Sequence, residues 1–241
     1  PPQRSATDHL RTAMDFDKKL NRRTGLTLLA AAAAGLPTLS AAQGAPRAGQ
    51  HYRKLSQRLP ASPGKIEVVE FFWYGCPACN AFEAVLQPWV KQLPPTMQFR
   101  HSHIGGRAQV KPHQRLFFAL QTMGVEHQFR SAIFAAIHQQ HQALDKPEDM
   151  IKLLQPLGLD VAKFNSTWAA LDPKAMGGVR IAQADKLAEA YGLDGVPTLG
   201  IGGLYTTSPS KASTGEQLNA LQGGQRALMV TEYLVNNFGK A

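Results

Sequence analysis

The stretch that organises the chain is residues 68–80, which read Val-Val-Glu-Phe-Phe-Trp-Tyr-Gly-Cys-Pro-Ala-Cys-Asn. A run of β-branched and aromatic residues that ends before Gly75 predicts a buried strand followed by a tight turn. Pro77 suits a first helical turn, because its φ is already fixed and no N–H is needed there. The sequence therefore predicts a strand, a turn and a helix that begins at the cysteines Cys76 and Cys79.

The two cysteines are separated by two residues and are the only cysteines in the chain. Unpaired backbone N–H groups and the positive dipole end at a helix N-terminus favour a thiolate over a thiol. Cys76 is nearer to that end, so we predict that Cys76 is the attacking thiol. Cys79 is close enough in sequence to close a small disulfide ring with it, and redox chemistry is the favoured interpretation.

Two other roles for the cysteine pair are open at this point. Two cysteines cannot form a Cys₄ zinc site within one chain, and none of the eight histidines stands at a tight ligand spacing from them. A structural disulfide across so short a loop would restrict the unfolded chain little, because the stabilisation grows with loop length. We therefore expect no metal, and no cofactor other than the redox-active disulfide itself.

Composition limits the class of protein. The 241 residues are 44% hydrophobic, enough for one core or for a domain with an insertion. The net charge is +9, of which residues 1–42 carry 6 − 3 = +3 and the remainder +6. These charges are spread without a dense basic block, so we expect no nucleic-acid partner.

The N-terminal region has the pattern of a secretory signal peptide. Two lysines and two arginines within residues 18–23 precede an apolar segment over residues 26–36, and small residues up to Ala42 offer a cleavage site. That segment is too short to span a membrane as a helix. We predict export to the periplasm with removal of residues 1–42, and Met14 as the translation start. Exported proteins meet conditions under which disulfides form.

The rest of the chain predicts an α/β fold. Strand patterns occur at residues 66–72 and 97–104, with a short further strand within residues 51–55. An extended segment starts at residue 194 and reverses at Gly202-Gly203, which predicts a two-residue hairpin turn. A polar loop over residues 207–215 then leads to a final helix, whose apolar residues should pack on the sheet: Leu228, Leu234, Val235 and Phe238.

Residues 110–191 are helical in pattern almost throughout, with five expected helices. Asp160 is a candidate N-cap for one of them, and Asp172-Pro173 should begin the last, which ends near Gly192. The histidines of this block, including His138 and His141, are interpreted as solvated helix surface.

This helical block is too long to be a simple crossover. A βαβ unit needs only about 30 residues, whereas residues 80–196, between Cys79 and Pro197, number 117. We therefore predict an inserted all-helical domain at residues 108–192, flanked by the two parts of the main domain at residues 43–107 and 193–241.

Taken together, these features resemble the DsbA family of exported thiol–disulfide oxidoreductases, which have a thioredoxin fold with an inserted helical domain. The resemblance covers most of the chain after the leader. It rests on the helical insertion and on four short motifs: Glu70-Phe71-Phe72, Cys76-Pro77-Ala78-Cys79, Phe82-Glu83 and Gly195-Val196-Pro197.

The resemblance implies roles for the matching residues. Cys76 would be the solvent-facing nucleophile, Cys79 the buried resolving cysteine and Pro197 a cis-proline against the disulfide. Val196 would offer its backbone N–H and C=O to an extended substrate segment, as in strand addition. Pro77 and Ala78 would complete that substrate-binding surface.

Glu70 and Glu83 match the acidic residues that the family places near the buried cysteine. A carboxylate there can take and return the proton of Cys79, with a pKa raised by burial. The alternative for Glu83 is an ordinary exposed helix position. Glu70 follows an apolar run and is harder to explain as surface.

One residue departs from the family pattern. The strongest oxidants of the family carry histidine before the second cysteine, where this chain has Ala78. Alanine leaves only the helix end and backbone donors to stabilise the Cys76 thiolate. We therefore expect a less stabilised reduced form and a milder oxidant.

The expected function is donation of the Cys76–Cys79 disulfide to unfolded exported polypeptides by a monomeric enzyme. A membrane quinone reductase resembling DsbB would reoxidise the cysteines. A disulfide reductase or isomerase is an alternative, although residues 43–64 are too few for the extra N-terminal domain of isomerases. Another is a folding helper that binds peptides around Pro197 without turnover.

Overall fold

A mixed five-stranded sheet lies at the centre of the computed structural model, which describes residues 44–61 and 64–240. The predicted leader over residues 1–42 lies outside the described residues. The strands are β1 (Arg53–Lys54), β2 (Ile66–Phe72), β3 (Met97–His103), β4 (Thr198–Ile201) and β5 (Tyr205–Thr207). Their order in the sheet is β1-β5-β4-β2-β3, with β2 and β3 parallel and the other neighbours antiparallel. The predicted bounds of β2 are confirmed.

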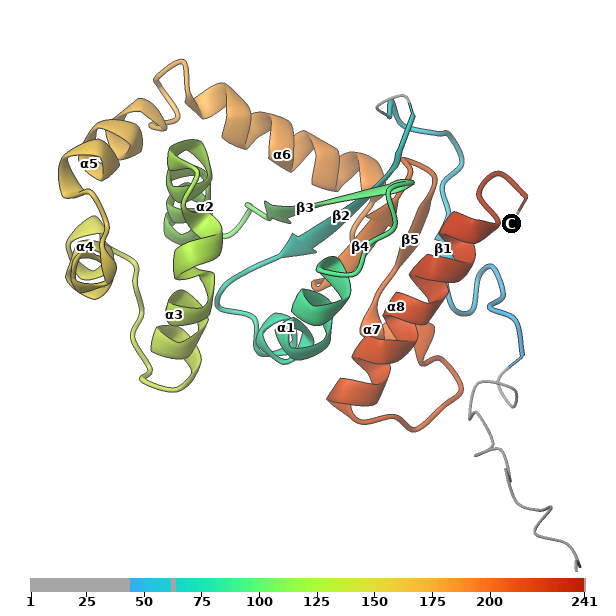
Figure 1. The fold of residues 1–241 in the computed structure, drawn as a ribbon. Helices are drawn as coiled ribbons and strands as arrows, with labels where there is room; N and C mark the ends of the chain where they lie inside the picture. Colours follow the sequence, from blue (N-terminus) through green and yellow to red (C-terminus); the bar gives the residue numbers. More distant parts are fainter. Residues whose placement is uncertain (1–43, 62–63, 241) are drawn as a thin grey trace, which may run out of the picture. The chain divides into compact units, whose positions relative to one another are not determined.

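Eight α-helices occur in the described part of the chain (Figure 1). They are α1 (Pro77–Val90), α2 (Lys111–Met123), α3 (Glu126–His138), α4 (Pro147–Leu154), α5 (Val161–Ala170), α6 (Gly178–Tyr191), α7 (Pro209–Ala212) and α8 (Ala220–Asn236). A 3₁₀ turn, η2 (Gln155–Leu157), follows α4. Within residues 44–61 and 64–240, none of these helices has the length and apolar character to cross a membrane.

Helices cover both faces of the sheet. Since the side chains of a strand alternate between its faces, neighbouring residues of β2 pack against different helices. Val68 belongs to the core formed with α1 and α8, whereas Val69 and Phe71 pack against Tyr191 at the end of α6. Glu70 is two residues from Val68 and therefore lies on the α1 face of β2. This placement brings a carboxyl group beneath the helix that carries the cysteines.

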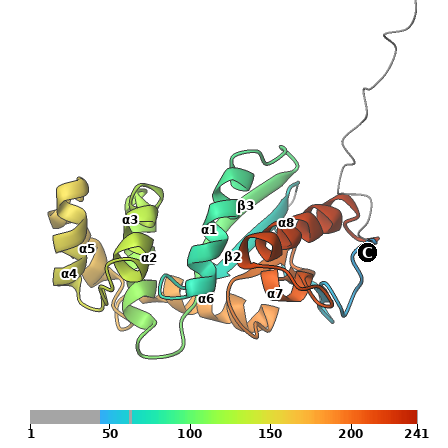
Figure 2. The ribbon, with the colours of Figure 1, turned by 90° about the horizontal axis from the view of Figure 1, so that it is seen from below.

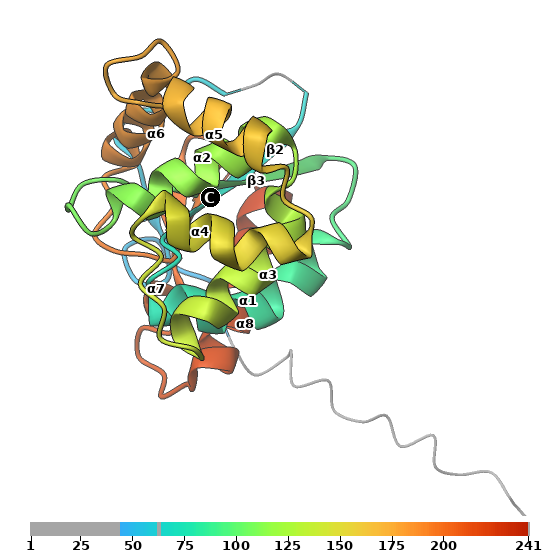
Figure 3. The ribbon, with the colours of Figure 1, turned by 90° about the vertical axis from the view of Figure 1, so that its left-hand side faces the viewer.

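The predicted helical insertion is formed by α2 to α6, between β3 and β4. Helices α2, α3, α4 and α5 stand to one side of the sheet (Figures 1 and 2) and in front of it when that side faces the viewer (Figure 3). Helix α2 contacts the edge strand β3. Their apolar core is continuous with Phe72, Tyr74 and Cys79. The insertion therefore packs directly against the cysteine pair, and its boundaries at residues 108 and 192 stay a prediction.

Within the insertion, the start of one helix was predicted correctly and the start of another was not. Asp160 caps α5, and its carboxylate accepts the N–H of Lys163 at 3.0 Å. Asp172-Pro173 was expected to begin the last helix, and this is wrong, because α6 begins at Gly178. The Asp172 carboxylate instead accepts the N–H of Lys174 at 3.0 Å, so a local turn competes with the helix.

The C-terminal hairpin reverses at Gly202 and Gly203, whose φ values are 56° and 67°. Strand pairing leaves Leu204 outside the ladder, so the loop has three residues and not the two that were predicted. The carbonyl of Leu204 accepts the N–H of Leu55 at 2.8 Å, which holds the N-terminal segment against the hairpin.

The predicted polar loop over residues 207–215 is partly helical. Ser208 Oγ accepts the N–H of Lys211 at 3.1 Å, and Pro209 occupies the first position of α7. The final helix, α8, packs on the sheet through Leu228, Leu234 and Val235, as expected, and Phe238 joins the same core just after the helix ends.

Candidate functional site

The cysteine pair lies at the start of α1, four residues after the end of β2. Cys76 is the N-cap position of α1, and its N–H donates to the carbonyl of Trp73 at 3.0 Å. Both cysteines are free thiols; Cys76 is half-buried and Cys79 fully buried. Pro77 and Ala78 between them are exposed. The local sequence thus presents one sulfur to the surface and withdraws the other into the core.

Electrostatics separate the two thiols further. A hydrogen bond from the Cys79 thiol lowers the pKa of Cys76 to about 6, assisted by the backbone N–H groups of Cys79 and Ala78 and by the charge of His138. Burial raises the pKa of Cys79, and the hydrogen bond to Cys76 and the charge of Glu70 raise it further. At neutral pH Cys76 is therefore a thiolate, and Cys79 holds a proton.

The Pro197 loop faces the Cys76 sulfur. The Val196–Pro197 peptide bond is cis, as expected, and Cys76 Sγ lies 3.4 Å from the carbonyl oxygen of Val196, to which it donates when the thiol is protonated. Pro197 is buried directly before β4, and Thr198 Oγ1 donates back to the carbonyl of Gly195 at 2.8 Å. The structure thus brings Val196 and Pro197 to the cysteine pair from more than a hundred residues away.

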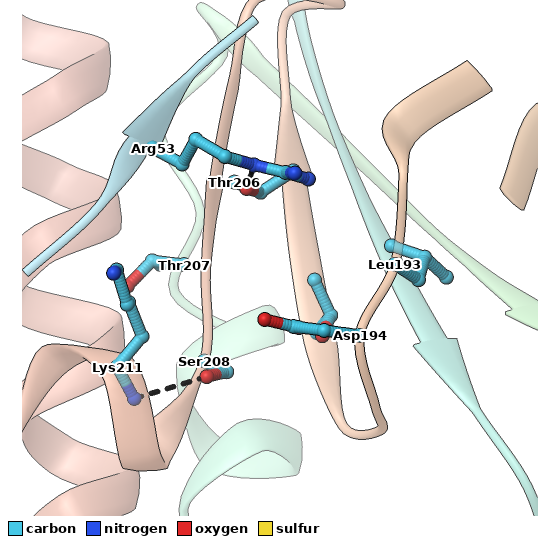
Figure 4. A pocket seen from close by; sticks show the side chains of 8 residues that line it. Arg53, Leu193, Asp194, Thr206, Thr207, Ser208 and Lys211 are labelled. Carbon is cyan, nitrogen blue, oxygen red and sulfur yellow. Dashed lines mark hydrogen bonds between the residues drawn. The ribbon is translucent and has the colours of Figure 1, made fainter. Parts of the chain in front are cut away.

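A surface groove opens beside this junction. It has a volume of about 480 Å³ and is lined by Ala78, the segment from Asp194 to Thr198 and residues of the α7 region. Figure 4 shows a smaller adjoining hollow of about 50 Å³, where Asp194 and Lys211 lie near the ends of β4 and β5. The smaller hollow has room for a few water molecules, and the groove is several times larger.

Glu70 and Glu83 both meet Arg130 of α3. Arg130 donates from Nη2 to Glu70 Oε2 at 3.1 Å and to Glu83 Oε1 at 2.7 Å, and from Nε to Glu83 Oε2 at 2.9 Å. Glu70 is fully buried, and the Glu83 side chain is 17% exposed. The exposed-helix interpretation of Glu83 is therefore wrong, because α3 covers it.

Two more side chains complete this charged cluster. Glu126 Oε1 accepts from Arg130 Nη1 at 3.1 Å and from the hydroxyl of Tyr74 at 2.6 Å. His101 Nδ1 lies 2.6 Å from Glu70 Oε2, and burial lowers the pKa of His101 to about 3. The ring is therefore neutral, and its contact with Glu70 is a hydrogen bond and not an ion pair.

His138 was interpreted as solvated helix surface, and this is wrong. The ring is half-buried, stacks on Phe134 and bonds the carbonyl of Tyr74 through Nε2 at 2.7 Å. Its charge contributes to the low pKa of Cys76. The expectation that Ala78 leaves only the helix end and backbone donors therefore fails as well. His141 is exposed, as expected.

Sequence reasoning also missed Arg130, Glu126 and His101. The four-residue spacing of Glu126 and Arg130 indicates an ion pair on one helix face. It gives no sign that the pair is buried. The parallel pairing of β2 and β3 sets His101 opposite Glu70, but that register is not visible in either strand alone. In the described ranges, no group of three or more His, Cys, Asp or Glu side chains is arranged to hold a metal ion.

Known proteins match both the sequence and this geometry. Residues 106–234 match the family model of the DSBA-like thioredoxin domain. The chain is similar to the thiol:disulfide interchange protein DsbA of Pseudomonas aeruginosa, with 40% identity over 191 residues that cover 78% of this chain and 83% of the relative. The protein of the same name from Burkholderia cepacia is 36% identical over 180 residues, which cover 74% and 82%.

Solved structures agree with the sequence matches. The crystal structure of Pseudomonas aeruginosa DsbA superposes with a TM-score of 0.71 at 36% identity and covers 80% of this chain and 94% of its own. The oxidoreductase DsbA from Xylella fastidiosa superposes with a TM-score of 0.70 at 25% identity and covers 82% and 100%.

Proposed function

The chain belongs to the DsbA family of thioredoxin-fold thiol:disulfide oxidoreductases, and from this premise we propose that it oxidises substrate thiols through Cys76. The observation that carries the proposal is the contrast between the two thiols: Cys76 is half-buried with a pKa of about 6, whereas Cys79 is buried with a raised pKa. A sulfur of low pKa is the better leaving group in thiol–disulfide exchange, which favours release of Cys76 from a mixed disulfide. Cys76 is the attacked sulfur because it is accessible, whereas Cys79 is buried.

The reaction proceeds in two exchanges. In the first, a substrate thiolate attacks Cys76 of the oxidised enzyme, a mixed disulfide forms, and Cys79 leaves with the electron pair of the broken bond. In the second, another substrate thiolate attacks the substrate sulfur of that mixed disulfide and Cys76 leaves as a thiolate. The substrate gains a disulfide, and the enzyme is reduced by two electrons.

Glu70 supplies a proton when Cys79 leaves. Burial raises the pKa of Glu70 to about 7, against the opposite effect of Arg130, so the carboxyl group exchanges its proton near neutral pH. The charge of Glu70 also raises the pKa of Cys79, which is consistent with proton transfer between them. Glu83 supports this step by holding Arg130, to which both of its carboxylate oxygens are bonded.

The groove beside Pro197 binds the substrate in an extended conformation. Ala78, Val196 and Pro197 line it, and the half-buried Val196 can offer its backbone N–H to a substrate strand. The substrates are unfolded polypeptides exported to the periplasm, and the enzyme acts as a monomer. A DsbB-like membrane quinone reductase restores the disulfide, which is the only redox group that the reaction uses.

Trapping experiments test this assignment. A Cys79→Ser variant mixed with an oxidised model peptide should accumulate a stable mixed disulfide at Cys76, because no resolving thiol remains. A Cys76→Ser variant should trap none, since Cys79 is buried. Wild-type protein should also oxidise a reduced, unfolded protein. Equal trapping by both variants would contradict the assignment of roles.

The same measurements separate the alternatives. A reductase or isomerase would leave a reduced substrate reduced or only reshuffle a scrambled one. A peptide-binding helper would bind an extended peptide equally well in the Cys76→Ser variant while wild-type protein showed no exchange. Either result would replace the oxidase assignment.

A further inference from the structure

Arg130 lies at the centre of a buried charged cluster that the two cysteine exchanges do not by themselves explain. The residue is 4% exposed and donates to three carboxylates: Glu70, Glu83 and Glu126. Its guanidinium also lies over the ring of Phe72, 4.1 Å from the centroid. These four contacts fix the position of the guanidinium group.

The cluster is not balanced in charge. Three ionised carboxylates against one guanidinium leave a net charge of −2, and the neutral ring of His101 does not offset it. A buried excess charge is costly, so such a cluster takes up a proton instead. Glu70 is the natural holder, because its Oε1 is buried and has no hydrogen-bond partner within the described residues.

Three of the elements packed around Glu70 place titratable or charged groups near it, whereas β4 places the apolar Leu199 opposite it. Strand β3 supplies neutral His101, α3 supplies Arg130 and Glu126, and α1 supplies Cys79 and Glu83. Arg130 lowers the pKa of Glu70, whereas burial and Glu126 raise it. The two α3 residues thus act in opposite directions on one proton.

We propose that Arg130 is a positioning residue for proton transfer at Cys79: its guanidinium group fixes the Glu70 carboxyl group and favours the ionised form that accepts a proton. This inference rests on the proposed function of Glu70 and extends it to the inserted helix α3. Without the guanidinium, Glu70 would keep its proton at neutral pH and could not accept one from Cys79.

A single-turnover reaction of the reduced protein with Ellman's reagent isolates the step. The Cys76 thiolate first attacks the reagent disulfide and releases one thionitrobenzoate anion. Cys79 then attacks the Cys76 sulfur, Glu70 takes the Cys79 proton, and the second thionitrobenzoate leaves with the electron pair of the broken bond. The first phase reports on Cys76, and the pH midpoint of the second phase reports on Glu70.

The two α3 variants should move that midpoint in opposite directions. Arg130→Gln removes the positive charge, so the second-phase midpoint should rise by about 1 to 3 pH units, as expected for loss of a close opposite charge. Glu126→Gln removes a like charge, and the midpoint should fall. Arg130→Lys restores the charge and should bring the midpoint back toward wild type. A role in folding alone would not produce shifts of opposite sign.

The control is Arg180→Gln, which removes an exposed arginine of α6 and should leave both phases unchanged. Absence of the first phase in wild-type protein would refute the proposed function itself. A normal first phase with the same second-phase midpoint in Arg130→Gln and wild type would overturn only the role of Arg130. If Arg130→Gln does not fold, Glu126→Gln decides: a midpoint that does not fall overturns the inference.

Discussion

The reactivity of Cys76 depends on donors and charges that come from different parts of the chain. The Cys79 thiol contributes most to its low pKa, followed by backbone N–H groups at the start of α1 and by His138 of α3. The exposed position between the cysteines, Ala78, adds only its backbone. A positive side chain placed there should therefore act on the sulfur independently of His138.

Replacing Ala78→His should lower the pKa of Cys76 and raise the reduction potential. An imidazolium beside the sulfur stabilises the thiolate, and stabilisation of the reduced form makes the disulfide easier to reduce. About 30 mV corresponds to roughly 1.4 kcal/mol for this two-electron couple, and we expect a change of about that size. Equilibration with glutathione measures the potential. An unchanged or lower value would show that the donors already present set the redox balance.

His138→Gln should change the pKa of Cys76 and the reduction potential in the opposite direction to Ala78→His. Glutamine keeps a donor that can reach the carbonyl of Tyr74 and removes the charge, so the pKa of Cys76 should rise and the potential should fall. Alkylation of Cys76 as a function of pH measures the first quantity. Equal alkylation midpoints in His138→Gln and wild type would mean that His138 is only a structural contact.

Single elements set the geometry of the groove. The β4–β5 hairpin follows Pro197 directly, so the positions of Val196 and Pro197 depend on how tightly the hairpin turns. Gly202 at its apex has φ of 56°, and a side chain there would run into the ring of Phe238 that follows α8. The hairpin is therefore fixed both by its own backbone and by the last helix.

Gly202→Ala should destabilise the protein by more than about 1 kcal/mol, because alanine at positive φ is strained and the methyl group would also displace Phe238. Gly106→Ala is a matched control: its φ is 98°, but open space surrounds the position. Thermal or urea unfolding should show the larger loss for Gly202→Ala. Equal losses would leave backbone strain as the whole effect and exclude a contribution from Phe238.

For the whole molecule, the cysteine pair and Glu70 link stability to pH. The folded-state pKa of Cys76 is about 6, below its ordinary value of 9.0, so the thiolate stabilises the reduced fold. This contribution is fully present above about pH 9 and is lost as the pH falls through 6. Glu70 acts in the opposite sense: its pKa is raised from 4.5 to about 7, so its contribution is fully present below 4.5 and is lost as the pH rises through 7.

The two effects can be separated by comparing redox states. The oxidised protein has no thiolate, so the melting temperature of the reduced form minus that of the oxidised form should increase as the pH rises from about 6 to 9. Glu70→Gln should remove the loss of stability between about pH 4.5 and 7 in the reduced protein. A difference between redox states that does not vary with pH would contradict the low pKa of Cys76.

The sequence alone determined the parts of this protein that depend on neighbouring residues. The bounds of β2, the cysteines at the start of α1, the Asp160 cap and the reversal at Gly202-Gly203 all follow from local periodicity, helix-end chemistry and backbone freedom. The length of residues 80–196 was enough to predict the helical insertion. At Asp172-Pro173 a local turn competes with helix formation, and the predicted helix boundary was wrong there.

Only the tertiary structure decided which groups act on the cysteines. Arg130 meets Glu70 across 60 residues and Glu83 across 47, and His138 reaches Tyr74 across 64. Helical periodicity predicts only that such residues share a polar face of the helix. It does not predict which other element will cover that face. Packing α3 against β2 and α1 buries that face. Burial removes water from the charged side chains on this face, and they therefore shift the pKa values of the groups around the cysteines. No local sequence pattern contains this effect.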